Sequence, residues 1–414
     1  MFLLRRLFFG IRNKVVRRSL THDFRMLYFS RITVNSATQL MGLFLPIFLY
    51  SFFDMRLSLV VIYYLVLDFS YAIFVPYGCL KIMNKIGIKR SLKISVLFGA
   101  AYYAFFFLLD QYFIKHDLVS EALKFWWLLP AMAFSLFFRL THWIPYHTNL
   151  AKLTERKIRA RQLSLMEATI MTLGAVMPVV AGLALSYLGY GALFLLALSI
   201  YLISIIPFSQ LPKVEEKFTW TYKKTWQTLL SKKFRNSVFA YVGDGAESIV
   251  GSIIWPIFLW QLLEGNYLQV GVISSLIILA TIILQALIGG PLDKLSNRRQ
   301  WLRYGVFFYA LGWVLKALIS TAFQVFLFSA YHNISRIFSR TSFDALNYDI
   351  AADQGHFVDE YTVVREIAVV LGKAIMGIFV LLLIPFLPLR LIFILAALAS
   401  LSMSLLKQGE VLSK

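Results

Sequence analysis

Cysteine, histidine and charge are all scarce in this sequence of 414 residues. The single cysteine, Cys79, excludes an intrachain disulfide and a cysteine-rich metal site. The 6 histidines are scattered, with no His-Glu-x-x-His motif, and no Gly-x-x-x-x-Gly-Lys-(Ser/Thr) phosphate loop occurs. We therefore expect no enzymatic activity, no ATP hydrolysis, no metal and no cofactor.

Charged residues make up 15% of the chain and hydrophobic residues 59%, with a mean hydropathy of +0.71. Soluble domains have about 25% charged residues, so this composition indicates lipid as the solvent. A membrane span needs about 20 apolar residues, and twelve spans with short loops would nearly fill the sequence. The fold class expected is an all-α polytopic membrane protein. The net charge is +20, and the basic residues lie between the apolar runs. This arrangement favours basic cytoplasmic loops over nucleic-acid binding.

Twelve transmembrane helices are expected, and the basic loops follow the even-numbered ones. This alternation places both termini in the cytoplasm, in an inner membrane. The acidic loop 349–360 departs from the alternation, but acidic residues count little in the orientation rule. The expected spans are 27–52, 57–80, 91–110, 124–150, 162–187, 190–210, 236–262, 267–290, 301–320, 323–348, 361–385 and 388–407.

The chain repeats itself at about half its length. Pro46-Ile47-Phe48-Leu49-Tyr50 returns about 210 positions later as Pro256-Ile257-Phe258-Leu259-Trp260. Internal duplication in an apolar chain is typical of secondary transporters, and it predicts two pseudo-symmetric six-helix halves. The organisation expected is a basic N-terminal interfacial segment (1–26), a first half (27–211), a cytoplasmic linker with an amphipathic helix (212–235) and a second half (236–414).

The loop after the second span of each half carries a matching basic motif. The first copy contains Asn84, Lys85, Gly87, Lys89 and Arg90, and the second contains Gly289, Asp293, Lys294, Arg298 and Arg299. The two copies resemble the major facilitator superfamily signature, Gly-x-x-x-Asp-(Arg/Lys)-x-Gly-(Arg/Lys)-(Arg/Lys). They depart from it at Asn84, at Leu80 and Ser296 in place of glycines, and by a final basic pair that comes one residue late.

The resemblance implies two halves that rock about a midplane site. A carboxylate at a helix end can accept hydrogen bonds from another helix's N-terminus or pair with an arginine. We therefore expect Asp293 to be a cytoplasmic latch and Asn84 to be a weaker one.

Ionisable residues inside a span cost at least about 2.5–3.5 kcal/mol on insertion scales, so they usually face a cavity or a partner. Asp68, Arg139, Arg336 and Lys373 lie near the middle of expected spans, and Asn35 and Gln39 are polar residues of the first. We expect these six to line a substrate and proton pathway. Because arginine suits carboxylate and phosphate groups, the substrate should carry an anionic or strongly accepting group, with Asp68 able to carry a proton. The alternative is a set of bracing ion pairs, for example Asp68 with Arg139.

A second layer of charges lies nearer the cytoplasm: Arg31, Glu167, Asp244, Glu247, Arg340, Asp344, Arg365 and Glu366. Glu167 and Glu366 occupy matching places in the two halves, which favours gate salt bridges over substrate contact. The expected cytoplasmic gate comprises Asn84, Gly87, Arg90, Glu167, Asp293, Arg298, Arg340, Asp344, Arg365 and Glu366.

The function expected is a secondary active transporter that moves a small solute by alternating access. We expect it to be coupled to protons, because Asp68 offers a protonatable site, with a lean to export. The expected partners are a small, anionic solute, protons or another coupling ion, and the lipid bilayer, and the chain should act as a monomer without nucleic acid. Two alternatives stay open: a non-transporting membrane sensor or assembly protein, and a lipid flippase on the same fold.

Overall fold

The computed structural model describes residues 21–116, 118–120, 123–154, 158–215, 217–292, 298–353 and 358–406. Over these ranges the chain is helical, with no strand, so the all-α fold class is confirmed. In the first half the helices are α3 (His22–Gly42), α4 (Phe44–Phe52), α5 (Leu57–Tyr77), α6 (Asn84–Ile86), α7 (Ile88–Leu108), α8 (Lys124–Trp127), α9 (Leu129–Leu153) and α10 (Arg159–Gln210). The linker carries α11 (Tyr222–Leu229). The second half contains α12 (Arg235–Ile249), α13 (Trp255–Leu262), α14 (Tyr267–Leu292), α15 (Arg298–Ala317), α16 (Ala322–Asp353), α17 (Val358–Leu383) and α18 (Ile392–Leu401).

Each expected span coincides with helix in the described part of the chain. Six helices there satisfy the length and hydropathy of a membrane span, or seven when α3 and α4, bent by 44°, count as one. The count of twelve therefore stays a prediction. Within α10 the helix is interrupted at Gly189, whose φ of 77° is one that a side chain disfavours. This interruption falls at the turn that the sequence places between the fifth and sixth spans.

The repeated five-residue phrase marks the same local structure in both halves. Pro46 lies in the first turn of α4, and Pro256 lies in the first turn of α13. A proline is tolerated there because the first N–H groups of a helix have no partner within it. Each short helix continues a longer one after a break: a bend after α3, and a π-helical segment, Val250–Ile254, after α12.

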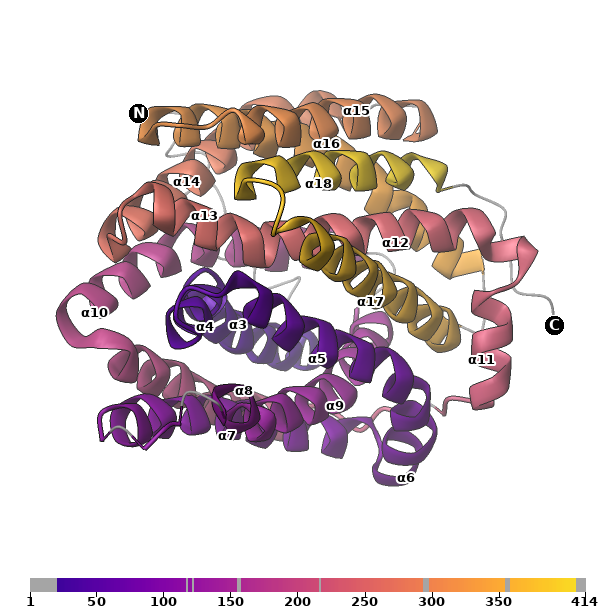
Figure 1. The fold of residues 1–414 in the computed structure, drawn as a ribbon. Coiled ribbons are helices and arrows are strands. Elements are labelled where there is room, and N and C mark those ends of the chain that lie inside the picture. Colours follow the sequence, from indigo (N-terminus) through magenta and orange to yellow (C-terminus); the bar gives the residue numbers. More distant parts are fainter. Residues whose placement is uncertain are drawn as a thin grey trace, which may run out of the picture.

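The two halves form two layers, with the first half below the second in Figure 1. They meet mainly through α10 against α14, α5 against α17, and α4 against α13. Small residues permit the first of these contacts. A Cβ on Gly271 would lie 2.3 Å from the backbone oxygen of Pro178, and one on Gly182 would lie 2.7 Å from that of Tyr267. Gly182 of α10 and Gly271 of α14 therefore allow the two helices to pack closely between the halves.

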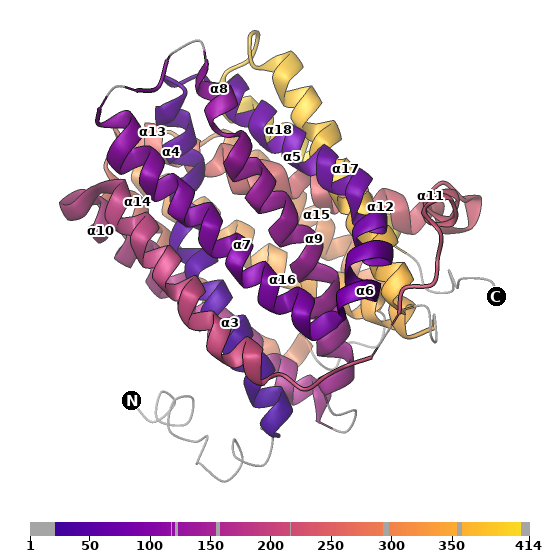
Figure 2. The same cartoon turned by 90° about the horizontal axis from the view of Figure 1, so that it is seen from below.

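One end of the bundle carries α6 and the linker helix α11, and we call it the linker side; the other end, with α4, α8 and α13, is the far side (Figure 2). The basic segment 1–26 lies mostly outside the described residues. α3 already begins at His22, where the Thr21 hydroxyl accepts a hydrogen bond from the backbone N–H of Phe24. The first helix is thus longer at its start than the hydrophobic pattern indicates, because this cap precedes its apolar residues.

Candidate functional site

Asp68 and Arg139 form an ion pair inside the first half. Arg139 Nη1 lies 2.5 Å from Asp68 Oδ1, joining α9 to α5. The Asp68 side chain is only 4% exposed and that of Arg139 is 20% exposed. Both charges are therefore compensated within the first half, as in the bracing alternative that the sequence left open.

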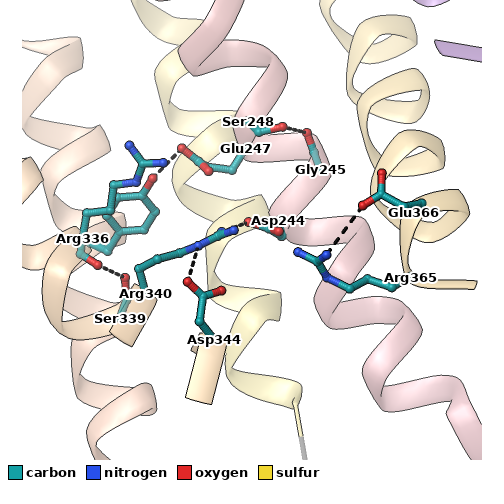
Figure 3. Close-up of polar contacts among 11 residues, drawn as sticks. Asp244, Gly245, Glu247, Ser248, Arg336, Ser339, Arg340, Asp344, Arg365 and Glu366 are labelled. Atoms are coloured by element: carbon teal, nitrogen blue, oxygen red, sulfur yellow. Dashed lines mark hydrogen bonds and ion pairs between the residues drawn. The ribbon is translucent and has the colours of Figure 1, made fainter. Parts of the chain in front are cut away.

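Arg340 of α16 holds two carboxylates in the second half (Figure 3). Its Nη1 lies 2.5 Å from Asp244 Oδ1 on α12, and its Nε lies 3.2 Å from Asp344 Oδ2 one turn along α16. Asp244 is 5% exposed. Asp244 therefore links α12 to α16 within the second half. Of the predicted gate residues, Arg340 and Asp344 form an ion pair with each other.

Glu247 lies one turn further into the bundle than Asp244, on the same helix. The Tyr309 hydroxyl of α15 donates a hydrogen bond to Glu247 Oε1 at 2.5 Å. Arg336 directs its guanidinium toward Glu247 (Figure 3) and is exposed, whereas Glu247 is 7% exposed. Over the described ranges Arg336 forms no ion pair within 4.0 Å, whereas Arg139 is paired with Asp68.

A buried cationic and aromatic cluster continues from Tyr309 toward the far side. Lys316 Nζ lies 4.2 Å from the ring centroid of Trp255 and 4.4 Å from that of Trp313, and the side chain is 5% exposed. His332 of α16 packs on Tyr309 and Trp313 with ring centroids 4.5 and 4.7 Å apart. Cation–π contacts of this kind stabilise a buried ammonium. Sequence reasoning missed this cluster, although residues 309, 313 and 316 share one face of a helix.

The remaining pathway candidates have local contacts. Asn35 donates a hydrogen bond to the backbone oxygen of Arg31, 2.9 Å away in the same helix. Gln39 lies beside Gly174 of α10, and Lys373 is half-buried on α17. Asn35 and Gln39 are uncharged, and Lys373 forms no ion pair in the described part of the chain. Their place in a pathway stays a prediction.

The gate residues that form ion pairs do so within their own half. Arg365 Nη1 lies 3.6 Å from Glu366 Oε1, its neighbour on α17. Exposed Glu167 is within electrostatic range of Arg31 in its own half and of Arg340 and Asp344 in the other. Over the described ranges, every ion pair made by the charges of these two layers joins residues of one half.

Asn84 contacts the linker. Its amide nitrogen donates to the backbone oxygen of Phe218 at 2.8 Å, and its amide oxygen accepts from the backbone N–H of the same residue at 2.9 Å. The next linker residue, Thr219, donates through its backbone N–H and its hydroxyl to Glu360 Oε1 of α17, at 3.0 and 2.6 Å. Two consecutive linker residues are thus held by side chains of opposite halves.

This contact explains the departure of the first motif from its pattern. An asparagine can donate and accept at once, whereas an ionised aspartate can only accept and would face the Phe218 carbonyl. Gly87, with a φ of 79°, makes the turn between α6 and α7, and Arg90 is exposed. Asp293 lies outside the described residues, as does the side chain of Arg298, so the second-half latch stays a prediction.

The far side is closed by aromatic contacts between the halves. Gln261 Nε2 of α13 donates to the Tyr50 hydroxyl of α4 at 2.7 Å, and the Tyr50 and Trp260 rings meet edge-on at 6.2 Å. Tyr267 of α14 adds edge-on contacts to Phe44 and Tyr190 of the first half, at 6.3 and 5.6 Å. The two copies of the repeated phrase therefore lie against each other.

Solved transporter structures share this architecture. A peptide transporter POT in complex with sulfate superposes with a TM-score of 0.69 at 14% identity, over 92% of this chain and 93% of that one. This chain has the major facilitator fold. A POT family transporter in complex with a thioalcohol conjugated peptide gives a TM-score of 0.70 at 11% identity, covering 92% and 94%. Another, in complex with 5-aminolevulinic acid, gives 0.67 at 13%, covering 92% of this chain and 94% of that one.

No family model and no curated protein matches the sequence. The likeness to solved structures therefore shows the fold alone, and the long apolar helices indicate an integral membrane protein. In this major facilitator fold, the described residues contain no group of three or more His, Cys, Asp or Glu side chains that could hold a metal ion. The side-chain groups that this site presents to a solute are arginine, lysine, carboxylate and phenol groups.

Proposed function

We propose that this protein is a secondary transporter that moves a small solute with an anionic group by alternating access. The observation that carries the proposal is the asymmetry of its two ends. The far side is joined across the halves by Tyr50, Trp260 and Gln261, whereas the linker-side charges pair within each half. Two halves that share aromatic and hydrogen-bond contacts at one end, and whose ion pairs at the other end stay within each half, are suited to a rocking movement.

The solute's anionic group is assigned to Arg336. Arg139 is neutralised by Asp68, while Arg336 is exposed and offers a planar set of donors suited to a carboxylate or phosphate. The fold neighbours support this class, because their crystal structures hold sulfate, a peptide derivative and 5-aminolevulinic acid. Amino-acid-like carboxylates and short peptides are therefore the first solutes to test.

Coupling to protons is the finer part of the proposal, with Glu247 and Asp68 as the protonatable groups. Each is a carboxyl group that lies beside an arginine of its own half. A proton that neutralises such a carboxylate releases the arginine for the solute. The direction of transport proposed is export, as the sequence suggests.

The test is transport by purified protein in liposomes under an imposed pH gradient, with radiolabelled di- and tripeptides and 5-aminolevulinic acid. We expect uptake or release of at least one of these solutes, and a loss of about 10-fold or more in Arg336→Lys, because the bidentate hydrogen bonds are worth roughly 1.5–3 kcal/mol. The matched control is Arg390→Lys, which changes an exposed arginine in the 3-10 turn just before α18.

Absence of movement for every anionic solute, together with no thermal stabilisation by any of them, would favour the non-transporting sensor. Movement of a fluorescent phospholipid between leaflets would instead support the flippase.

A further inference from the structure

An apolar groove of about 440 Å³ lies on the outside of the second half, among α12, α17 and α18. The three helices run next to one another in Figure 1. The groove is lined by Val242, Gly243 and Ala246 of α12, by Ile375, Met376 and Phe379 of α17, by Leu398 and Ala399 of α18, and by Ser402 just after α18.

Small residues make this groove. α12 and α17 cross closely, since a Cβ on Gly245 would lie 1.8 Å from the backbone oxygen of Val369 and one on Gly372 would lie 2.0 Å from that of Val242. α18 approaches α12 at Gly243, where a Cβ would meet the Ser402 hydroxyl. With the helices fixed at these contacts, Ala246 and Ala399 leave the space between them unfilled.

The groove offers only apolar surface to an occupant. The one hydroxyl in its lining, that of Ser402, donates to the backbone oxygens of Ala399 and Phe239 at 2.8 and 3.2 Å. Phe379 and Leu398 are 52% and 61% exposed, so the groove opens to the outside of the bundle. In a bilayer the molecules at this surface are lipids, and an acyl chain fits a lining of this kind.

Three positive charges stand at the linker-side end of the groove. The Arg235 guanidinium lies 5.5 Å from the ring centroid of Phe239, which lines the groove one turn along α12. Lys232 and Lys233 lie three and two positions before it, in the 3-10 turn Lys232–Phe234, and all three side chains are exposed. Over the described ranges none of the three forms an ion pair with a carboxylate.

We propose that this groove is a binding site for an anionic phospholipid, with an acyl chain among α12, α17 and α18 and the headgroup phosphate on Arg235, Lys232 and Lys233. The three positive charges favour a phospholipid with an anionic headgroup. Each basic residue near a membrane surface contributes about 1 kcal/mol of attraction to anionic lipid, and one zwitterionic headgroup has no net charge to match three cations. The site does not depend on the transport function, because it lies outside the contact between the halves.

The test is native mass spectrometry and thermal unfolding of delipidated protein in detergent, titrated with dioleoyl phosphatidylglycerol and, separately, dioleoyl phosphatidylcholine. We expect the wild type to bind at least one phosphatidylglycerol about 10-fold or more tightly than phosphatidylcholine. The triple variant Lys232→Gln, Lys233→Gln, Arg235→Gln should lose this preference. A second variant, Ala399→Phe, fills the groove and should weaken binding of phosphatidylglycerol with the three charges intact.

The matched control removes the same charge elsewhere, with Lys81→Gln, Lys85→Gln and Lys223→Gln, all exposed. This control should keep the preference. Equal binding of both lipids by the wild type would overturn the proposal and leave only annular lipid at the groove. An equal loss in the control and the triple variant would also overturn it, because the attraction would then belong to the whole basic surface.

Discussion

At the scale of single residues, the role of a polar side chain can depend on the exact groups of its partner. Asn84 is the clearest example, because its amide both donates to and accepts from Phe218. Its first-half motif therefore binds the linker where the pattern's aspartate is expected to bind a helix end. The sequence could place Asn84 in a loop, but the partner is 134 positions away and carries no pattern of its own.

Asn84→Asp should loosen the linker. The variant removes the donor and places a carboxylate against the Phe218 carbonyl, at a cost of about 1–3 kcal/mol for the unsatisfied group. Limited trypsin digestion at Lys223 and Lys224 should then be at least about 5-fold faster than in the wild type. Lys85→Gln, an exposed neighbour, is the control and should leave the rate unchanged. Equal rates in Asn84→Asp and the wild type would show that the linker is held by other contacts.

The buried pair of Asp68 and Arg139 makes a second residue-scale prediction. Asp68→Asn leaves the Arg139 charge uncompensated and should lower the free energy of unfolding by about 3–5 kcal/mol. Adding Arg139→Gln removes that charge, so the double variant should recover at least half of the loss. Chemical unfolding in detergent measures both. A double variant less stable than Asp68→Asn would mean that Arg139 has another partner of equal weight.

At the scale of helices, hydrophobic runs predicted the positions of the elements well, because lipid-facing helices need long apolar segments. Where the pattern was weaker, the boundaries moved. α3 begins at His22 because Thr21 caps it, and α16 continues to Asp353, beyond its apolar part. The sequence also placed the turn at Gly189 correctly, since a Leu-Gly pair interrupts the run there. Which charges pair across helices could not be predicted, because the rotation of each helix depends on all of its neighbours.

Close packing of α12 against α17 gives a prediction for these elements. Gly372→Ala adds a Cβ that would lie 2.0 Å from the Val242 backbone oxygen, so the two helices must separate. We expect a loss of about 1–3 kcal/mol, as for other overpacked sites, seen as a lower midpoint of thermal unfolding. Gly42→Ala is the control, since a Cβ there meets nothing within 4 Å. If both variants unfold at the wild-type temperature, the helix crossing is looser than the structure has it.

At the scale of the whole molecule, the duplicated halves and their opposite contacts at the two ends define the expected movement. The repeat and the loop motifs were sufficient to predict two halves. They could not predict which end is joined, because the proposed alternating access requires one sequence to allow both arrangements.

Distances between spin labels should report this movement. Met55→Cys with Glu264→Cys samples the far side, and Lys81→Cys with Arg303→Cys samples the linker side; all four are exposed, and Cys79→Ala removes the native thiol. On adding a transported solute or changing the pH, one distance should lengthen while the other shortens. Distances that stay fixed under every solute and pH, in protein that is folded, would contradict rocking halves.

The meeting of Tyr50 with Trp260 has a consequence for the history of the chain. These residues end the two copies of one phrase, and the copies touch where the two halves meet. Such a contact is isologous: a single patch is complementary to itself. A homodimer of one ancestral half would have closed with this same patch. Before duplication, any substitution in it changed both sides of the contact at once, and only a fused chain lets tyrosine and tryptophan diverge to form an asymmetric pair.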